Sequence, residues 1–76
     1  MTTIEHVLAA LPAAPPGLTT AEVRSAVRRA VPGITDAETI EALGRLGTGR
    51  ADVRKVECAT ERDERGEWVT RWWRVR

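Results

Sequence analysis

The spacing of apolar residues changes once along this chain, near Arg50, and that change limits which folds are possible. Before it, apolar residues recur every three or four positions, which is the period of helices with one buried side. After it the period is two, and β-branched and aromatic residues gather there, as is typical of strands. The sequence therefore predicts helices followed by a pair of strands.

Prolines and glycines divide the helical part into three segments. The predicted helices cover residues about 3–11, 20–31 and 35–47. Pro12 ends the first, and Pro32 with Gly33 separates the second from the third, because proline cannot continue the hydrogen-bond ladder. Thr19 with Glu22 three residues later matches a capping box at the start of the second helix.

The apolar spacing of the third segment predicts which side of it is buried. Ile40, Leu43 and Leu46 are spaced to face the core. The outer face would then show Glu38, Glu41, Ala42 and Arg45, with Asp36 and Thr39 nearby. Acidic residues in the first turn favour the helix dipole, which accounts for Asp36 and Glu38 better than for Glu41.

The two predicted strands cover residues about 52–60 and 67–75, joined by a charged, glycine-ended tip. In the second strand, alternation places Trp68 and Trp72 on one face and Trp73 on the other. We expect Trp73 in the core, and Trp68 with Trp72 on the outer face as an interface for a second copy or another protein. Cys58 alternates with Val56 and is expected to be a small buried residue.

Composition excludes several classes of protein. The 76 residues suit a single domain over residues 1–76. One cysteine and one histidine exclude an internal disulfide and a Cys/His metal site. We recognise no nucleophile–base pair, carboxylate cleft or phosphate loop, so we expect neither an enzyme nor a cofactor.

Charge and hydropathy bear on location and partners. We expect no membrane span and no signal peptide, and hence a cytoplasmic protein. Twelve basic residues against eleven acidic ones leave a net charge of +1, whereas domains that depend on phosphate contacts usually have a larger basic excess. The preference for arginine over lysine and the abundant alanine suggest a GC-rich genome, such as that of an actinobacterium or its bacteriophage.

The order of these elements resembles the winged helix-turn-helix family. The matching residues are Leu18 to Val23 at the second helix, Pro32-Gly33-Ile34 at the turn, Ile40, Leu43 and Leu46 on the third helix, Val53 onward in the first wing strand, and Trp73-Arg74-Val75 in the closing strand. The resemblance implies an α+β fold, with three helices and a C-terminal two-stranded β-hairpin wing. It also implies a third helix that enters the major groove of DNA and a wing that touches the backbone or minor groove.

The resemblance and the basic residues together suggest a set of DNA contacts. They are Arg28, Arg29, Thr39, Arg45, Arg50, Arg62 and Arg65. Arg24 and Arg28 are like charges four positions apart, an unfavourable pair unless an anion lies nearby. Acidic neighbours also leave the hairpin tip nearly neutral.

Two functions follow as hypotheses. The first is a transcriptional regulator or phage accessory factor that binds double-stranded DNA as a homodimer, which the fold resemblance and the basic C-terminal end favour. The second is a winged-helix module that binds a protein partner instead, which the near-neutral charge and the acidic third helix favour.

Overall fold

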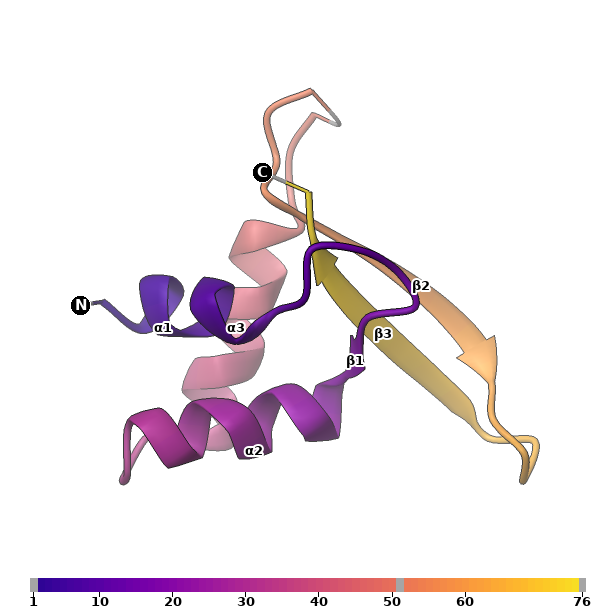
Figure 1. The fold of residues 1–76 in the computed structure, drawn as a ribbon, viewed down its shortest axis with the longest axis horizontal. Helices are drawn as coiled ribbons and strands as arrows, with labels where there is room; N and C mark the ends of the chain where they lie inside the picture. Colours follow the sequence, from indigo (N-terminus) through magenta and orange to yellow (C-terminus); the bar gives the residue numbers. More distant parts are fainter. Residues whose placement is uncertain (1, 51, 76) are drawn as a thin grey trace.

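Three helices and three antiparallel strands follow one another in the computed structural model, which describes residues 2–50 and 52–75. This is an α+β fold (Figure 1). The elements are α1 (Thr3–Ala10), β1 (Leu18–Thr19), α2 (Thr20–Ala30), α3 (Asp36–Leu46), β2 (Val56–Arg62) and β3 (Trp68–Arg74). Each helix lies within one residue of its predicted bounds.

Threonine side chains begin all three helices of the described chain. Thr2 Oγ1 accepts a hydrogen bond from the Glu5 backbone N–H at 3.2 Å. The capping box of Thr19 and Glu22 is confirmed, and Thr35 with Glu38 forms a second one at α3. These side chains satisfy backbone donors that a helix start leaves without partners, which is why the helix starts were predictable from local sequence.

The sheet has the strand order β1-β3-β2, so β3 is central. β1 was not predicted. It pairs Leu18 with Trp72 and Thr19 with Arg71. Gly17 allows this close approach, because a Cβ atom there would stand 2.2 Å from the carbonyl oxygen of Trp72, and its φ of +79° also favours glycine.

The hairpin differs from the predicted one at its start. The first strand was predicted from residue 52 but begins at Val56. Val53 and Arg54 instead donate their backbone N–H groups to the Arg50 carbonyl, which makes a turn there. The tip of the hairpin is a tight turn, in which the Asp63 carboxylate accepts hydrogen bonds from the backbone N–H groups of Arg65 and Glu67 at 2.9 Å each.

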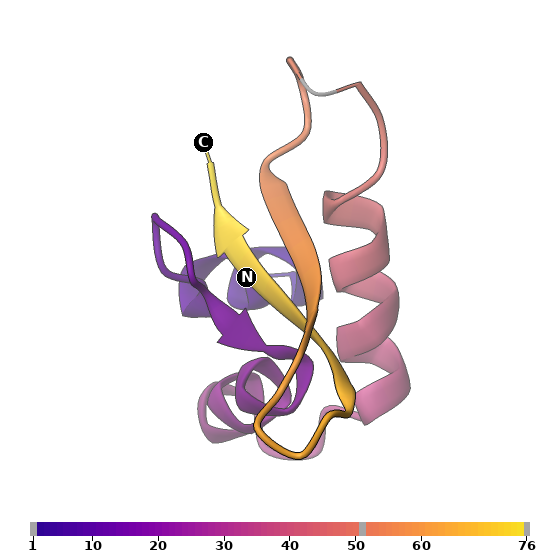
Figure 2. The same cartoon turned by 90° about the vertical axis from the view of Figure 1, so that its right-hand side faces the viewer.

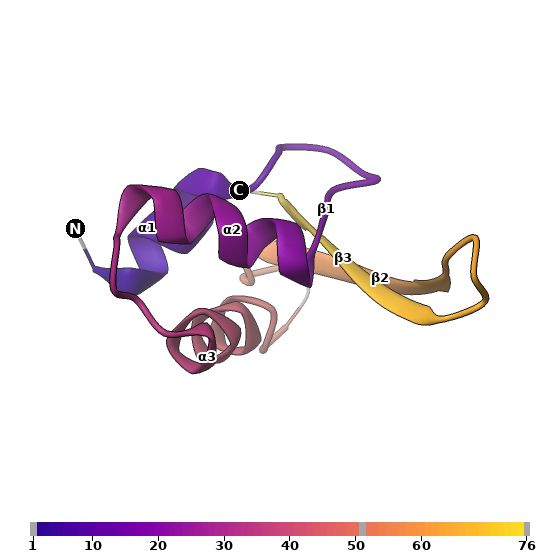
Figure 3. The ribbon, with the colours of Figure 1, turned by 90° about the horizontal axis from the view of Figure 1, so that it is seen from below.

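The core lies between the helices and one face of the sheet. Its buried residues come from every helix and from the start of β2: Val7, Leu11, Val23, Val27, Ala42, Leu43, Leu46 and Val56. The end of the hairpin extends beyond all three helices (Figures 1 and 3). We call residues 60–70, which make up this projecting part, the arm.

Helix α3 is turned relative to the sequence prediction. Ile40, expected in the core, is 48% exposed, whereas Thr39 and Ala42 are buried. The rotation is roughly half of the 100° between successive helix residues. The physical reason is packing, because Thr39 and Ala42 are small enough to lie against the core. The Thr39 hydroxyl donates a hydrogen bond to the Thr35 carbonyl at 3.3 Å. This side of α3 is therefore buried without an unpaired polar group.

Trp72 and Trp73 each lie on the face of the sheet opposite to the one predicted. Trp72 packs against the core, and its Nε1 donates to Thr20 Oγ1 at 2.8 Å. Trp73 points to the opposite face of the sheet, because side chains alternate along a strand. Trp72 is therefore not part of an outer interface. Cys58, opposite Trp72, is exposed rather than buried.

Candidate nucleic-acid interface

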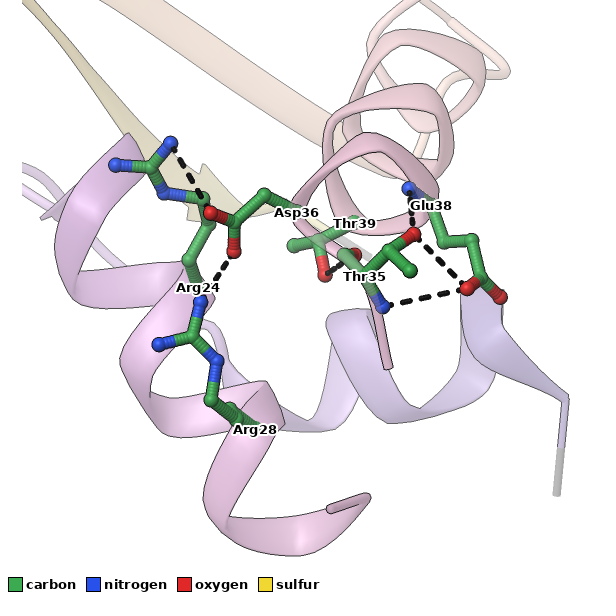
Figure 4. Close-up of polar contacts among 6 residues, drawn as sticks. All are labelled: Arg24, Arg28, Thr35, Asp36, Glu38 and Thr39. Atoms are coloured by element: carbon green, nitrogen blue, oxygen red, sulfur yellow. Dashed lines mark hydrogen bonds and ion pairs between the residues drawn. The ribbon is translucent and has the colours of Figure 1, made fainter. Parts of the chain in front are cut away.

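The arginines of α2 share one carboxylate with the start of α3. Asp36 lies between Arg24 and Arg28, and its two oxygens contact one guanidinium each (Figure 4). The Arg24 contact is 3.9 Å long. Asp36 is thus the anion that makes two like charges four positions apart acceptable, in addition to lying at the positive end of the helix dipole.

Two further predicted DNA contacts are in local ion pairs. Arg45 contacts Glu41 at 2.9 Å, and Arg50 contacts Asp52 at 3.1 Å. All four side chains are mostly exposed. Exposed ion pairs contribute about 0–1 kcal/mol, so a phosphate group can replace either carboxylate at little cost.

Two of the predicted contacts lie away from the others. Thr39 is 1% exposed and cannot reach a ligand, so that prediction is wrong. Arg29 is exposed and borders a shallow hollow on α2 together with Ser25 and Glu22. Its Nε donates to the Ser25 carbonyl at 3.4 Å. Arg29 lies one residue before the end of α2, and that end of the helix points away from the arm (Figure 1).

The two faces of the hairpin differ in charge. We call the face that carries Val56 and Trp72 the inner face, and the opposite one the outer face. In the described strands β2 and β3, no carboxylate occupies an inner position, whereas Glu57 and Glu61 both lie on the outer face. Glu61 is also neutralised there by Arg71, at 2.7 Å.

On the inner face of the arm, two cross-strand pairs lie side by side. Thr60 and Thr70 hydrogen-bond through their hydroxyl groups at 3.1 Å. Next to them, the guanidinium of Arg62 stands over the indole of Trp68, 4.8 Å from the ring centroid. That distance is a cation–π contact. Within the described chain, Arg62 and Arg65 form no ion pair, so their charges are available to a ligand.

Helix α3 presents two different flanks. Ile40, Gly44 and Gly47 recur at intervals of four and three, so they form one line along the helix. A Cβ atom at Gly47 would stand 3.4 Å from Cζ3 of Trp72, which shows that this line turns toward the hairpin. From Ile40 to Gly47 this line carries no charge. Asp36, four positions before Ile40, lies on the same side of the helix and is paired with Arg24 and Arg28.

The acidic residues of α3 lie on its other flank. Glu38, Glu41 and Arg45 line a hollow of about 300 Å³, whose far side is formed by the start of α1 (Thr2, Thr3 and Ile4). Glu38 and Glu41 are exposed, as predicted, but they are turned toward α1. Ala42, predicted beside them, is buried. The rotation of α3 therefore moves its carboxylates away from the arm.

Helix α3 and the arm lie at an angle to each other, with no other described element between them on one side (Figure 3). We call this open angle the α3–arm corner. Figure 2 shows α3 and the hairpin from the end of the arm. The helix side of the corner is α3, which carries the exposed Ile40, and the strand side is the arm, which carries Arg62 and Trp68 on its inner face. These groups can contact apolar or aromatic surfaces and anions.

Two features of this corner were not predicted from the sequence. Ile40 was assigned to the core, and Arg62 was not paired with Trp68. The pairing depends on the register of the hairpin, which its turn fixes. The signal that was present is the turn itself, because Asp63 and Gly66 mark its ends.

Comparison with known proteins gave no match. No family model, no curated protein and no solved structure matches this chain. Within residues 2–50 and 52–75, no helix combines the length and the apolar character needed to cross a membrane. Among those same residues, no group of three or more His, Cys, Asp or Glu side chains is placed to hold a metal ion.

Proposed function

We propose that this protein is a winged helix-turn-helix protein of the cytoplasm that binds duplex DNA in the α3–arm corner. The order of its elements, three helices followed by a β-hairpin, supports the proposal. The observation that carries it is the distribution of charge. The inner positions of strands β2 and β3 hold no carboxylate, although the chain as a whole has eleven acidic residues, and Asp36 at the start of α3 is paired with Arg24 and Arg28.

The shape of the corner suits a double helix. An α-helix fits the major groove, and a two-stranded ribbon beside it can follow the phosphates. Arg62 and Arg65 on the arm provide guanidinium groups that form no ion pair among the described residues. Arg50, beyond the end of α3, can exchange its exposed carboxylate partner for a phosphate, whereas Arg45 lies on the flank of α3 that faces α1.

The low net charge predicts weak, salt-dependent binding. Each phosphate contact contributes a slope of about −0.9 in log affinity against log salt. With a net charge of only +1, we expect on the order of three to five contacts. The measurement is the affinity for a fluorescent duplex by anisotropy, at several salt concentrations.

A matched pair of variants tests where the DNA binds. Arg65→Gln and Arg29→Gln each remove one exposed arginine that forms no ion pair within the described chain, one on the arm and one on the far flank of α2. Arg65→Gln should reduce the salt slope by about one contact, and Arg29→Gln should leave it unchanged. Equal effects of the two variants would place the DNA elsewhere, and no binding at low salt would refute the function.

A protein partner is the second candidate, and one observation favours it. Ile40 on α3 is 48% exposed and Trp68 on the arm is 65% exposed, and aromatic residues are enriched at protein interfaces. If the partner is a second copy of the chain, its contact depends on Trp68, because Trp72 packs inside. This candidate would be supported if the wild type does not bind DNA at low salt and self-associates, and if Ile40→Asp abolishes the self-association.

A further inference from the structure

Trp68 is the most exposed of the large apolar residues in the described chain, at 65%. It begins β3 at the outer end of the hairpin, beyond the helices. Trp72, four residues later on the same face, packs on the core. The two inner-face tryptophans thus differ in environment, and the proposed contact with duplex DNA gives the indole of Trp68 no specific role.

The position of the Trp68 ring is fixed by its surroundings. Arg62 lies directly opposite it in the strand register and places its guanidinium over the ring, 4.8 Å from the centroid. On the side of the core, Thr60 and Thr70 form a cross-strand hydrogen bond through their hydroxyl groups. On the side of the turn, the Asp63 carboxylate accepts a hydrogen bond from the Glu67 backbone N–H. The contact with Arg62 favours one orientation of the ring, which lowers part of the entropy cost of binding.

The groups around Trp68 select a ligand that is both planar and anionic. Arg62 and Arg65 bring positive charge without an ion-pair partner among the described residues. The strand carboxylates Glu57 and Glu61 lie on the opposite face. At the tip, the Asp63 carboxylate is engaged by two backbone N–H groups, and Glu64 and Glu67 offset part of the charge of Arg62 and Arg65. A nucleic-acid strand offers both features, because each nucleotide joins an aromatic base to a phosphate.

A base within a regular duplex cannot use this surface, because its two faces are covered by the neighbouring base pairs. An unpaired base at a strand end, an overhang or a junction leaves a face open. Such a base can stack on an aromatic side chain whatever its identity. The preference that Trp68 provides should therefore be for DNA structure rather than DNA sequence.

We propose that Trp68 and Arg62 form a base-stacking site at the end of the arm, which gives the protein a preference for DNA with an unpaired base next to a duplex. Arg62 and Arg65 would contact the phosphates beside that base. This inference rests on the proposed binding of duplex DNA and adds a second part of the ligand, the unpaired nucleotide.

The test compares three DNA probes of the same duplex sequence, measured by anisotropy and by tryptophan fluorescence. One is blunt, one carries a three-nucleotide overhang, and one carries the same overhang with abasic sugars, which keeps the phosphates and removes the bases. We expect the overhang to bind about five-fold or more tighter than the other two, from stacking of one base. It alone should quench the tryptophan fluorescence.

Protein variants connect this preference to Trp68. Trp68→Leu should abolish the preference, and Trp68→Phe should keep part of it, because a smaller aromatic ring remains. Trp73→Leu is the matched control, since Trp73 lies on the outer face of the same strand. It should leave the preference unchanged.

Each contrary result has a distinct meaning. Equal affinities for all three probes, with Trp68→Leu as wild type, would overturn the stacking site and leave duplex binding intact. Equal weakening of all probes by Trp68→Leu would also overturn it, because the indole would then act on the duplex. No binding of any probe would overturn both proposals, and self-association lost in Trp68→Leu would assign Trp68 to a protein contact.

Discussion

At the scale of single residues, a small number of side chains determine where helices begin and which strand face is buried. Thr19 and Glu22 close the start of α2 by exchanging hydrogen bonds with each other's backbone. The pKa of the Glu22 carboxyl is lowered, first because it accepts from the Thr19 backbone N–H and then because of the Thr19 side chain. This capping box can therefore be tested through pH.

Glu22→Gln should change how stability depends on pH. Because the pKa of Glu22 is lower in the folded chain, its ionised form favours folding. That contribution is complete above the ordinary carboxyl pKa of 4.5 and is lost as pH falls through the lowered value. Chemical denaturation should show wild type and variant differing more at pH 7 than at pH 3. A difference independent of pH would contradict this reading.

Trp72 should be the tryptophan that the fold requires. Trp72→Ala removes a ring that packs on the core and hydrogen-bonds Thr20, at an expected cost of about 3–5 kcal/mol, enough to unfold a domain of this size. Trp73→Ala, on the outer face, should remain folded. Circular dichroism with thermal melts measures both. A folded Trp72→Ala together with an unfolded Trp73→Ala would show that the sheet is turned over.

At the scale of elements, local signals were sufficient for the helices but not for their orientation. Threonine caps and proline breaks lie next to the helix ends, so the bounds were predictable. The buried side of α3 was not predictable. Thr39 and Ala42 are buried where Ile40 was expected, and neither has the large apolar side chain that is typical of a core position. Trp72 and Trp73 are adjacent, so alternation places one of them inside in either register. A two-residue strand such as β1 is too short to show alternation.

The contact between α2 and α3 should respond to the removal of Asp36. Asp36→Asn leaves Arg24 and Arg28 without their shared carboxylate. Because the pairs are exposed, we expect a loss of stability below about 1 kcal/mol. Both arginines then become free for phosphates, so DNA affinity should rise and the salt slope should steepen. Anisotropy titrations measure this, with Glu5→Gln, a carboxylate of α1, as the control for charge alone. A weaker DNA affinity in Asp36→Asn would show that Asp36 positions α3 for binding.

At the scale of the whole molecule, the fold separates charges that the composition only averages. The net charge of +1 is an average over surfaces that differ in charge. The α+β class and the hairpin were predictable from the sequence. The corner was not, because it depends on the rotation of α3 and on the hairpin register, which are both set by packing between distant residues.

The charge difference between the two hairpin faces makes the inner side of the hairpin the more attractive one for an anion. A polyanion that approaches from the outer side meets Glu57 and Glu61, which are paired with Arg54 and Arg71, and one that approaches from the inner side meets Arg62, which has no ion-pair partner among the described residues. Fields of this kind act before contact, by turning the molecules as they approach each other. The arm should therefore contribute more to the orientation of encounters, and so to the association rate at low salt, than to the lifetime of the complex.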